Sequence, residues 1–253
     1  MCLINFQLKA HPRYKLVIAA NRDEFYGRPT ARAAFWPDAP HILAGRDLHQ
    51  MGTWLGISKK GRFAALTNYR EPANQTDGKR SRGEIVTNFL QRDESPEEFL
   101  MLLKEREAEY QGFNVLVGSP DELFYYGNRG GEIQRVMPGI HALSNALLDT
   151  PWPKVEKGRT EMSRLLSSRE ISIEKLFSMM ENHQQAPTEQ LPETGVSLEW
   201  EQLLSPMFIK TENYGTKSST VLLIDQHNEV TFVERTYHNG KKVAEVNFQL
   251  QLC

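Results

Sequence analysis

The sequence predicts an α+β fold in which two antiparallel sheets are covered by helices. The order of expected elements is strands, two helices, strands, two helices and strands. Paired helices between runs of strands are typical of antiparallel sheets with helices outside, not of a βαβ array. Most strands are short apolar or alternating runs bounded by turn residues. Two sheets stacked face to face between helical layers, an αββα sandwich of four layers, accommodate this order economically.

The first half of the chain is rich in expected strands. They lie at residues 2–8, 14–20, 42–45, 53–57 and 63–67, and Lys59 to Gly61 forms a hairpin turn between the last two. Residues 28–40 and the polar residues 71–79 are expected to be loops. Ser81 followed by Glu84 predicts a capped helix through Leu90, and Ser95 before a proline starts a second helix through residue 103.

The second half repeats this order. Strands are expected at residues 112–117, 123–126, 133–144, 219–225, 229–235 and 242–249. Helices are expected at residues 152–166 and 173–180, the first weakened by Gly158. Residues 184–197 are polar and contain two prolines, so they are expected to form a long surface loop.

Charge and composition exclude some classes of partner. The net charge is −2, with 25% charged residues, which argues against nucleic acid or an anionic membrane as the main partner. Lys79, Arg80 and Arg82 form a small basic group, but Asp77 and Glu84 flank it, so a solvated loop is expected.

The cysteines and the first residues indicate the cellular compartment of the protein. Cys2 and Cys253 are the two cysteines, at opposite ends, which is no disulfide framework. Lys9 and Arg13 interrupt the opening before an apolar signal-peptide core forms, and no stretch approaches the roughly 18 apolar residues of a membrane span. The sequence therefore predicts a soluble, cytoplasmic protein without a transmembrane segment.

Motifs of the common cofactor enzymes are missing from the sequence. There is no G-x-G-x-x-G, no complete phosphate-binding loop, no G-x-S-x-G and no pair of histidines at metal spacing. We therefore expect neither a cofactor nor a metal.

The thiol at position 2 is the strongest chemical feature. Removal of Met1 would give Cys2 a free α-amine with a pKa of about 7.7–8.0, suited to act as its base. If residues 2–8 and 14–20 pair antiparallel, Arg22 lies near Cys2 and favours the thiolate. Asp23 or Glu24 would orient the amine or the arginine. The alternative interpretation is a small buried cysteine beside a local salt bridge.

Asn21-Arg22-Asp23-Glu24 in this setting resembles the signature of the NRDE family, and the likeness spans nearly the whole chain. Further matching segments are residues 1–4, 28–30, 43–48, 52–56, 67–70, 81–84, 143–145, 152–154 and 214–220. Met51 stands where the family usually has glycine, and Lys217 where arginine is common. The resemblance implies a single domain over residues 1–253.

The family resembles the N-terminal nucleophile hydrolases, which implies the αββα sandwich and a cysteine acylase of the penicillin V acylase and bile-salt hydrolase type. The resemblance implies that Cys2 is the nucleophile, Arg22 assists it, and Asn145 donates to the oxyanion. A backbone N–H near Asn68 or Tyr69 would be the second donor. Those acylases have Arg-x-x-Asp, so the register leaves Asp23 and Glu24 as alternatives. The residues expected to bind substrate are Asn21, Glu24, Asn68, Tyr69 and Lys217.

The activity implied by the resemblance is hydrolysis of a small acyl amide. The alternative is a non-catalytic haem or lipid carrier on the same fold, because animal relatives are linked to haem movement and lipid homeostasis. The ligand would then be hydrophobic. The sequence leaves the oligomeric state and the substrate open.

Overall fold

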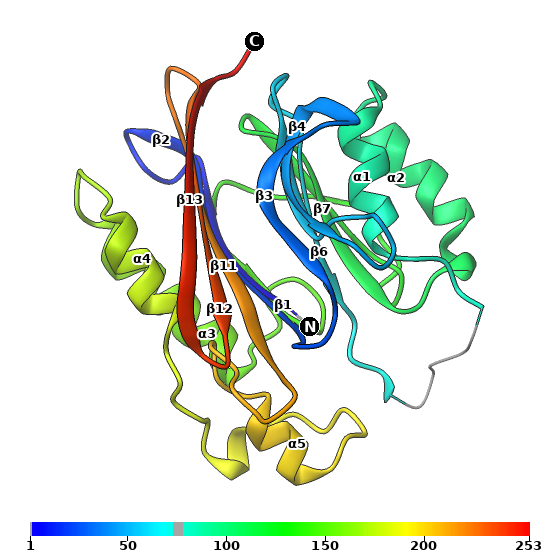
Figure 1. Cartoon of the computed structure of the whole chain (residues 1–253), viewed down its shortest axis with the longest axis vertical. Coiled ribbons are helices and arrows are strands. Elements are labelled where there is room, and N and C mark those ends of the chain that lie inside the picture. The colour runs from blue at the N-terminus through cyan, green and yellow to red at the C-terminus, as the bar shows by residue number, and fades with distance from the viewer. Residues whose placement is uncertain (1, 73–77) are drawn as a thin grey trace.

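A computed structural model describes residues 2–72 and 78–253 of the chain, which form the four layers expected from the sequence (Figure 1). Sheet A has six strands in the order β10 (Gly139–Leu143), β1 (Cys2–Leu8), β2 (Tyr14–Phe25), β11 (Tyr214–Asp225), β12 (Glu229–His238) and β13 (Lys241–Gln251). Sheet B has seven strands in the order β3 (Thr30–Trp36), β4 (Ala39–Asp47), β5 (Leu55–Ser58), β6 (Phe63–Asn68), β7 (Phe113–Ser119), β8 (Glu122–Gly127) and β9 (Gln134–Arg135).

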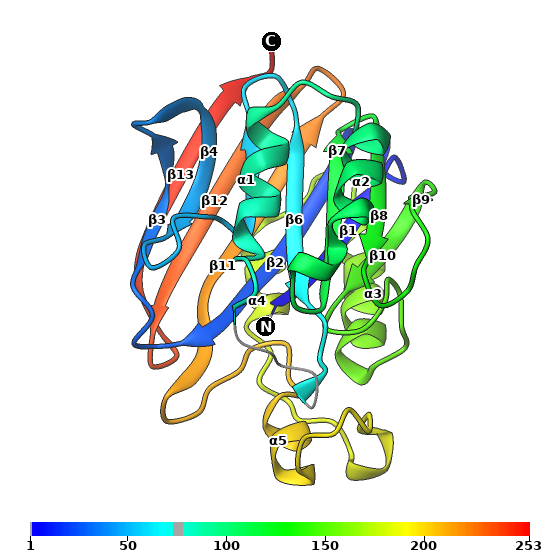
Figure 2. The ribbon, with the colours of Figure 1, turned by 90° about the vertical axis from the view of Figure 1, so that its right-hand side faces the viewer.

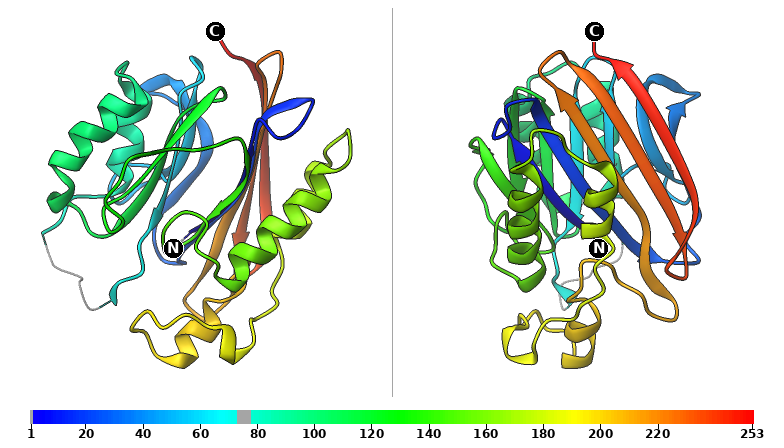
Figure 3. Two further views of the ribbon diagram at one scale, coloured as in Figure 1. Left: turned by 180° about the vertical axis from the view of Figure 1, so that it is seen from behind. Right: turned by 90° about the vertical axis from the view of Figure 1, so that its left-hand side faces the viewer.

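Helices cover the outer face of each sheet. Figure 2 shows α1 (Gly83–Gln91) and α2 (Pro96–Glu105) in front of sheet B. Figure 3 shows the opposite side, where α3 (Pro153–Leu166) and α4 (Ile173–Met180) cover sheet A. The short α5 (Leu198–Leu203) lies at one end, and two short 3-10 helices are Glu107–Glu109 and Thr188–Gln190. Among the described residues, no helix is long and apolar enough to cross a membrane.

Side-chain alternation places the core in three layers. Ile4, Phe6 and Leu8 of β1 pack with Leu55 and Ile57 of β5 between the two sheets. The intervening residue of β1, Leu3, packs instead against α3 and α4. A third cluster joins sheet B to α1 and α2. This alternation, with a period of two, decides which residues of β1 and β2 face the space between the sheets.

Gly158 in α3 has a packing reason that offsets its low helix propensity. A Cβ at this position would lie 2.1 Å from the Asn5 side-chain oxygen of β1. The glycine therefore lets α3 approach sheet A closely, and the helix expected at residues 152–166 forms as Pro153–Leu166.

Two expectations about the first hundred residues are wrong. Residues 28–40 contain β3, an edge strand between Pro29 and Pro37, because proline is tolerated at the ends of an edge strand. The first residue before α1 is Arg82, not Ser81, and no side chain caps this end. The Ser95 prediction is confirmed, because Ser95 and Glu98 form a reciprocal capping box at α2.

Other expectations need smaller changes. The strands expected through residues 133–144 are confirmed as β9 and β10, which are short, and the unexpected α5 follows the loop expected at 184–197. The loop expected at residues 71–79 lies partly outside the described residues. Met51, which replaces the usual glycine, has a φ of 60°, a left-handed conformation that glycine adopts without steric cost.

Candidate active site

The N-terminal cysteine and the first charged residue of the NRDE segment are directly opposite each other. β1 and β2 pair antiparallel with Cys2 opposite Arg22, as expected if the first two strands pair. Directly opposed side chains share a face of the sheet. Because Ile4 and Ala20 belong to the core between the sheets, Cys2 and Arg22 also lie on that face.

Arg22 is held by sheet B. Its guanidinium carbon lies 4.3 Å from the centre of the Trp54 ring, and Nη1 donates to the Thr30 hydroxyl at 3.0 Å. A Cβ at Gly45 would lie 2.3 Å from the Trp54 ring, so the glycine in β4 makes room for the indole. The position of Arg22 therefore depends on packing between the sheets as well as on its own strand.

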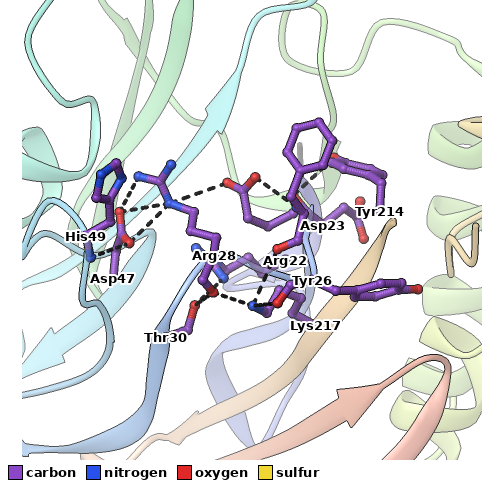
Figure 4. A network of polar contacts seen from close by, with 11 residues as sticks. Arg22, Asp23, Tyr26, Arg28, Thr30, Asp47, His49, Tyr214 and Lys217 are labelled. Atoms are coloured by element: carbon purple, nitrogen blue, oxygen red, sulfur yellow. Dashed lines mark hydrogen bonds and ion pairs between the residues drawn. The ribbon is translucent and has the colours of Figure 1, made fainter. Parts of the chain in front are cut away.

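Asp23 follows Arg22 in β2 and lies beside Cys2. Its backbone N–H acts on the Cys2 thiol by lowering the pKa of that thiol. Its carboxylate accepts from the Thr216 hydroxyl at 2.7 Å. Its carbonyl accepts from the Tyr214 hydroxyl at 3.1 Å (Figure 4). Burial raises the pKa of the Asp23 carboxyl, which is 1% exposed. Two hydroxyls of β11 thus fix the residue that follows Arg22.

A bulge in β11 lies opposite this pair. The register between β2 and β11 shifts between Thr216 and Ser218, which leaves Lys217 as the extra residue. The Lys217 ammonium donates to the carbonyls of Tyr26 at 3.0 Å and Arg28 at 2.5 Å, around the turn after β2 (Figure 4). Burial lowers the pKa of Lys217. This predicted substrate-binding lysine therefore contacts backbone of the β2–β3 turn.

Glu24 and Asn21 have different surroundings from Asp23. Glu24 accepts from the Phe25 N–H at 2.9 Å and lies 3.8 Å from the Arg28 guanidinium. Arg28 forms a shorter pair of 2.5 Å with Asp47 (Figure 4). Asn21 is buried on the helical side, where its amide donates to the carbonyls of Met180 and Met207, both at 2.9 Å. Asn21 therefore joins β2 to segments of the α4 side.

The two predicted asparagines meet at the end of β6. The Asn145 amide donates to the Asn68 carbonyl at 2.9 Å. The backbone N–H of Tyr69 already donates to the Gly112 carbonyl at 2.9 Å. Asn68 lines the same cavity as Cys2, whereas Tyr69 and Asn145 line a neighbouring cavity of about 300 Å³.

A cavity of about 210 Å³ lies beside Cys2 between the start of β1, the end of β6 and the N-terminus of α1. Its lining brings together Cys2, Arg22, Asp23 and Glu24, together with Trp54. The basic segment 79–82 is a loop with Lys79 and Arg80 exposed, as expected, but it also lines this cavity and Arg82 is half-buried there.

The thiol needs a base to react at neutral pH. Burial raises the pKa of the Cys2 thiol, which is 8% exposed, and the negative charge of Asp23 adds to this rise. The Arg22 guanidinium and the Asp23 N–H act in the opposite direction by stabilising the thiolate. The site favours ionisation locally but does not overcome desolvation.

A buried charged cluster next to the site was missed by the sequence analysis. Arg70 and Glu201 form an ion pair of 2.5 Å, with side chains 5% and 3% exposed. Lys154, at the start of α3, donates to the Leu204 carbonyl at 3.0 Å, and burial followed by the charge of Arg70 lowers its pKa to about 8. Asp23 opposes this lowering. The available signal was the matching segment 152–154, which includes Lys154.

Comparison with known families gives a match over almost the whole chain. The family model described as Transport and Golgi organisation 2 matches residues 1–239. The chain belongs to the Transport and Golgi organisation 2 family. The mouse member is 36% identical over 93% of both chains. The human member is 37% identical over the same shares, and the Drosophila melanogaster member is 30% identical over 93% of this chain and 92% of its own.

Two solved structures share the fold of this member of the Transport and Golgi organisation 2 family. A C2A mutant of the conjugated bile acid hydrolase from Clostridium perfringens has a TM-score of 0.52 and 9% identity, covering 98% of this chain and 92% of its own. A Caenorhabditis elegans orthologue of N-acylethanolamine-hydrolyzing acid amidase has a TM-score of 0.51 and 9% identity, covering 88% and 92%. At this identity the likeness shows the shared fold.

Proposed function

We propose that the protein is a cysteine N-terminal nucleophile amidohydrolase that acts on a small acyl amide. The observation that carries the proposal is the position of the Cys2 thiol. It lines a cavity of about 210 Å³, with Arg22 directly opposite it on β2 and Asp23 in the same lining. The two structural neighbours give further support, because their names describe a conjugated bile acid hydrolase and an amidase.

The proposed reaction begins after removal of Met1. The α-amine of Cys2 takes the thiol proton, and the thiolate attacks the amide carbonyl carbon. The C–N bond then breaks, the proton passes from the Cys2 ammonium to the leaving amine, and an S-acyl thioester remains. Water attacks this thioester while the amine takes its proton. The acid product leaves and the thiol is restored.

Arg22 and Asp23 have separate roles in this scheme. The Arg22 guanidinium lies opposite Cys2 and stabilises the thiolate. Asp23 is the acidic partner that we favour over Glu24, because it is buried beside Cys2, where it would orient the α-amine, and its carboxylate is fixed by Thr216. Glu24 is engaged with the Phe25 N–H and faces Arg28.

The proposed oxyanion donors are the Asn145 amide and the backbone N–H of Asn68. One Asn145 N–H holds the Asn68 carbonyl at 2.9 Å, and an amide has a second N–H to offer. Asn68 is preferred to Tyr69, because the Tyr69 N–H donates to Gly112 and Asn68 lines the Cys2 cavity. Such a donor typically contributes about 2.7–4 kcal/mol to transition-state binding.

The lining of the cavity supports an amide rather than haem or lipid. Charged side chains form much of it, including Arg22, Glu24 and Arg82. Ligands without matching polar groups would leave these charges desolvated without compensation. We therefore prefer catalysis on a polar amide to the hydrophobic carrier.

A screen of N-acyl amides with protein that has lost Met1 tests the proposal. The wild type should release amine from at least one amide, and Cys2→Ala should release none while its circular dichroism is unchanged. Cys253→Ala, which removes the exposed thiol, is the matched control and should keep full activity. Turnover that survives in Cys2→Ala would show that another group does the chemistry.

A further inference from the structure

Two guanidinium groups in the Cys2 cavity have no carboxylate partner among the described residues. Arg28 pairs with Asp47 at 2.5 Å, and Arg80 pairs with Glu84 at 2.6 Å. Within residues 2–72 and 78–253, neither Arg22 nor Arg82 has a carboxylate oxygen within 4 Å. The cavity therefore contains more positive charge than its own side chains neutralise.

Arg22 has a role already, but Arg82 does not. Arg22 stacks on Trp54 opposite Cys2, where its charge serves the thiolate. Arg82 donates one hydrogen bond, from Nη1 to the Gly112 carbonyl at 2.9 Å. Burial lowers the pKa of the Arg82 guanidinium, and the charge of Glu24 opposes this lowering without forming an ion pair within 4 Å among the described residues. Such a charge is unfavourable unless a ligand compensates it.

The end of a helix adds to the same positive potential. Arg82 occupies the N-cap of α1, and Ser81, Arg82 and Gly83 all line the cavity. Among the described residues no side chain caps this end of the helix, and the N–H groups of Glu84 and Ile85 donate to the backbone carbonyls of Ser81 and Arg82 at 3.2 and 3.1 Å. The α1 N-terminus therefore directs its partial positive charge toward the same space as Arg82.

We propose that Arg82 and the N-terminus of α1 bind an anionic group of the substrate, so that the amide cleaved at Cys2 carries a carboxylate or a similar anion. The proposal rests on the function proposed above and names the class of its substrate. The anion belongs to the leaving amine or to the acyl chain, and the two cases share the same chemistry. Arg82 is then a specificity-determining residue, because it contacts the substrate anion and not the reacting bond.

Alkylation of Cys2 tests whether the cavity has a positive electrostatic potential, and it does not require the protein to turn over a substrate. Iodoacetate and iodoacetamide attack a thiol in the same way, but the first carries a negative charge. Cys253, an exposed free thiol in the same chain, is the internal reference. The ratio of iodoacetate to iodoacetamide rates should be about three- to tenfold higher at Cys2 than at Cys253 in low salt, and this excess should shrink at high salt.

Two variants distinguish the effect of the positive charge of Arg82 from the effect of its side-chain shape. Arg82→Gln should remove most of the excess in the iodoacetate ratio, whereas Arg82→Lys should retain it. If both variants lose it equally, the effect comes from the hydrogen bond to Gly112 and the proposal is wrong. An equal ratio at Cys2 and Cys253 in the wild type would also overturn it. These outcomes hold whether or not any amide is hydrolysed, so they are independent of the proposed activity.

Matched amides then locate the anion. An N-acylglycine should have a higher kcat/KM than the corresponding N-acylglycinamide if the leaving amine carries the charge. A glutaryl amide should exceed a pentanoyl amide if the acyl chain carries it. Arg82→Gln should reduce the preferred ratio by about tenfold, which corresponds to one charged contact. Turnover without preference for the anion in either pair would contradict the proposal and leave the proposed hydrolase activity standing.

Discussion

Cys2 of β1 and Arg22 of β2 are opposite each other, and the Trp54 ring from the other sheet holds the Arg22 guanidinium carbon at 4.3 Å. The relationship links the candidate nucleophile to the packing of the two sheets. A thiol at the end of a buried strand would ordinarily remain protonated. The neighbouring guanidinium gives a specific reason for the thiolate to form in this position.

Replacement of Arg22 by a neutral residue should slow the alkylation of the Cys2 thiol. Arg22→Gln removes the positive charge opposite Cys2, so the pKa of the thiol should rise further. We expect alkylation of Cys2 by neutral iodoacetamide at pH 7.5 to slow by about three- to tenfold. Arg22→Lys keeps the charge and should slow it less. Equal rates in the wild type and Arg22→Gln would show that this charge does not act on Cys2.

Asp23 and Glu24 should differ sharply as acidic partners. Asp23→Asn removes the buried carboxylate that would orient the α-amine of Cys2, and it should lower kcat by about 10²-fold or more. Glu24→Gln keeps the shape of a side chain that faces Arg28 and should change kcat by less than about threefold. Steady-state kinetics on one amide compare the two. The reverse order would assign the acidic role to Glu24.

Gly45 should matter through Trp54. In Gly45→Ala the new Cβ would lie 2.3 Å from the indole ring, so Trp54 and the stacked Arg22 must move. We expect a loss of about 1–3 kcal/mol of stability on urea unfolding, together with slower alkylation of Cys2. Gly27→Ala is the matched control, because a Cβ there meets no atom within 4 Å. Unchanged alkylation in Gly45→Ala would separate Trp54 from the site.

Glu234 should make stability depend on pH. Its side chain is buried and accepts from the Ala33 N–H at 2.7 Å, which joins sheet A to β3. Burial raises the pKa of Glu234 from 4.5 to about 7. The folded state therefore binds this proton more tightly than the unfolded chain, so the free energy of unfolding falls as pH rises from about 4.5 to 7 and is level above.

The Glu234→Gln variant isolates this effect. Glutamine keeps the shape and cannot ionise, so the wild type should lose up to about 3 kcal/mol relative to the variant between pH 4.5 and 7.5. Urea unfolding at several pH values measures the difference. A difference that stays constant across this range would contradict the buried, proton-binding state of Glu234.

The sequence predicts the α+β class and the pairing of the first two strands because those features rest on local patterns. Apolar runs give β1 and β2, and the capping box at Ser95 gives α2. β3 was missed because Pro29 and Pro37 resemble loop signals, although they flank an edge strand.

The contact of the basic segment 79–82 with the Cys2 cavity could not be predicted from its local sequence. Arg82 reaches the cavity because α1 packs closely on the residues before β5, where a Cβ at Gly52 would lie 2.6 Å from the Gly83 carbonyl carbon. Lys154 is likewise buried by contacts with residues far along the chain, including the Leu204 carbonyl. Such approaches depend on tertiary packing, which periodicity and composition do not encode.

In the proposed reaction an amide acylates the Cys2 thiol, and the α-amine of Cys2 acts as the base. Protein that has lost Met1 is mixed with the best amide from the screen, quenched in acid and digested, and the N-terminal peptide is weighed by mass spectrometry. We expect an added acyl mass on the peptide that begins at Cys2. We expect no added mass in Cys2→Ala, which lacks the thiol, or in a variant with glutamine inserted before Cys2, in which the α-amine of Cys2 is part of a peptide bond. Turnover with no acyl group on Cys2, or equal acylation in the inserted variant, would contradict it.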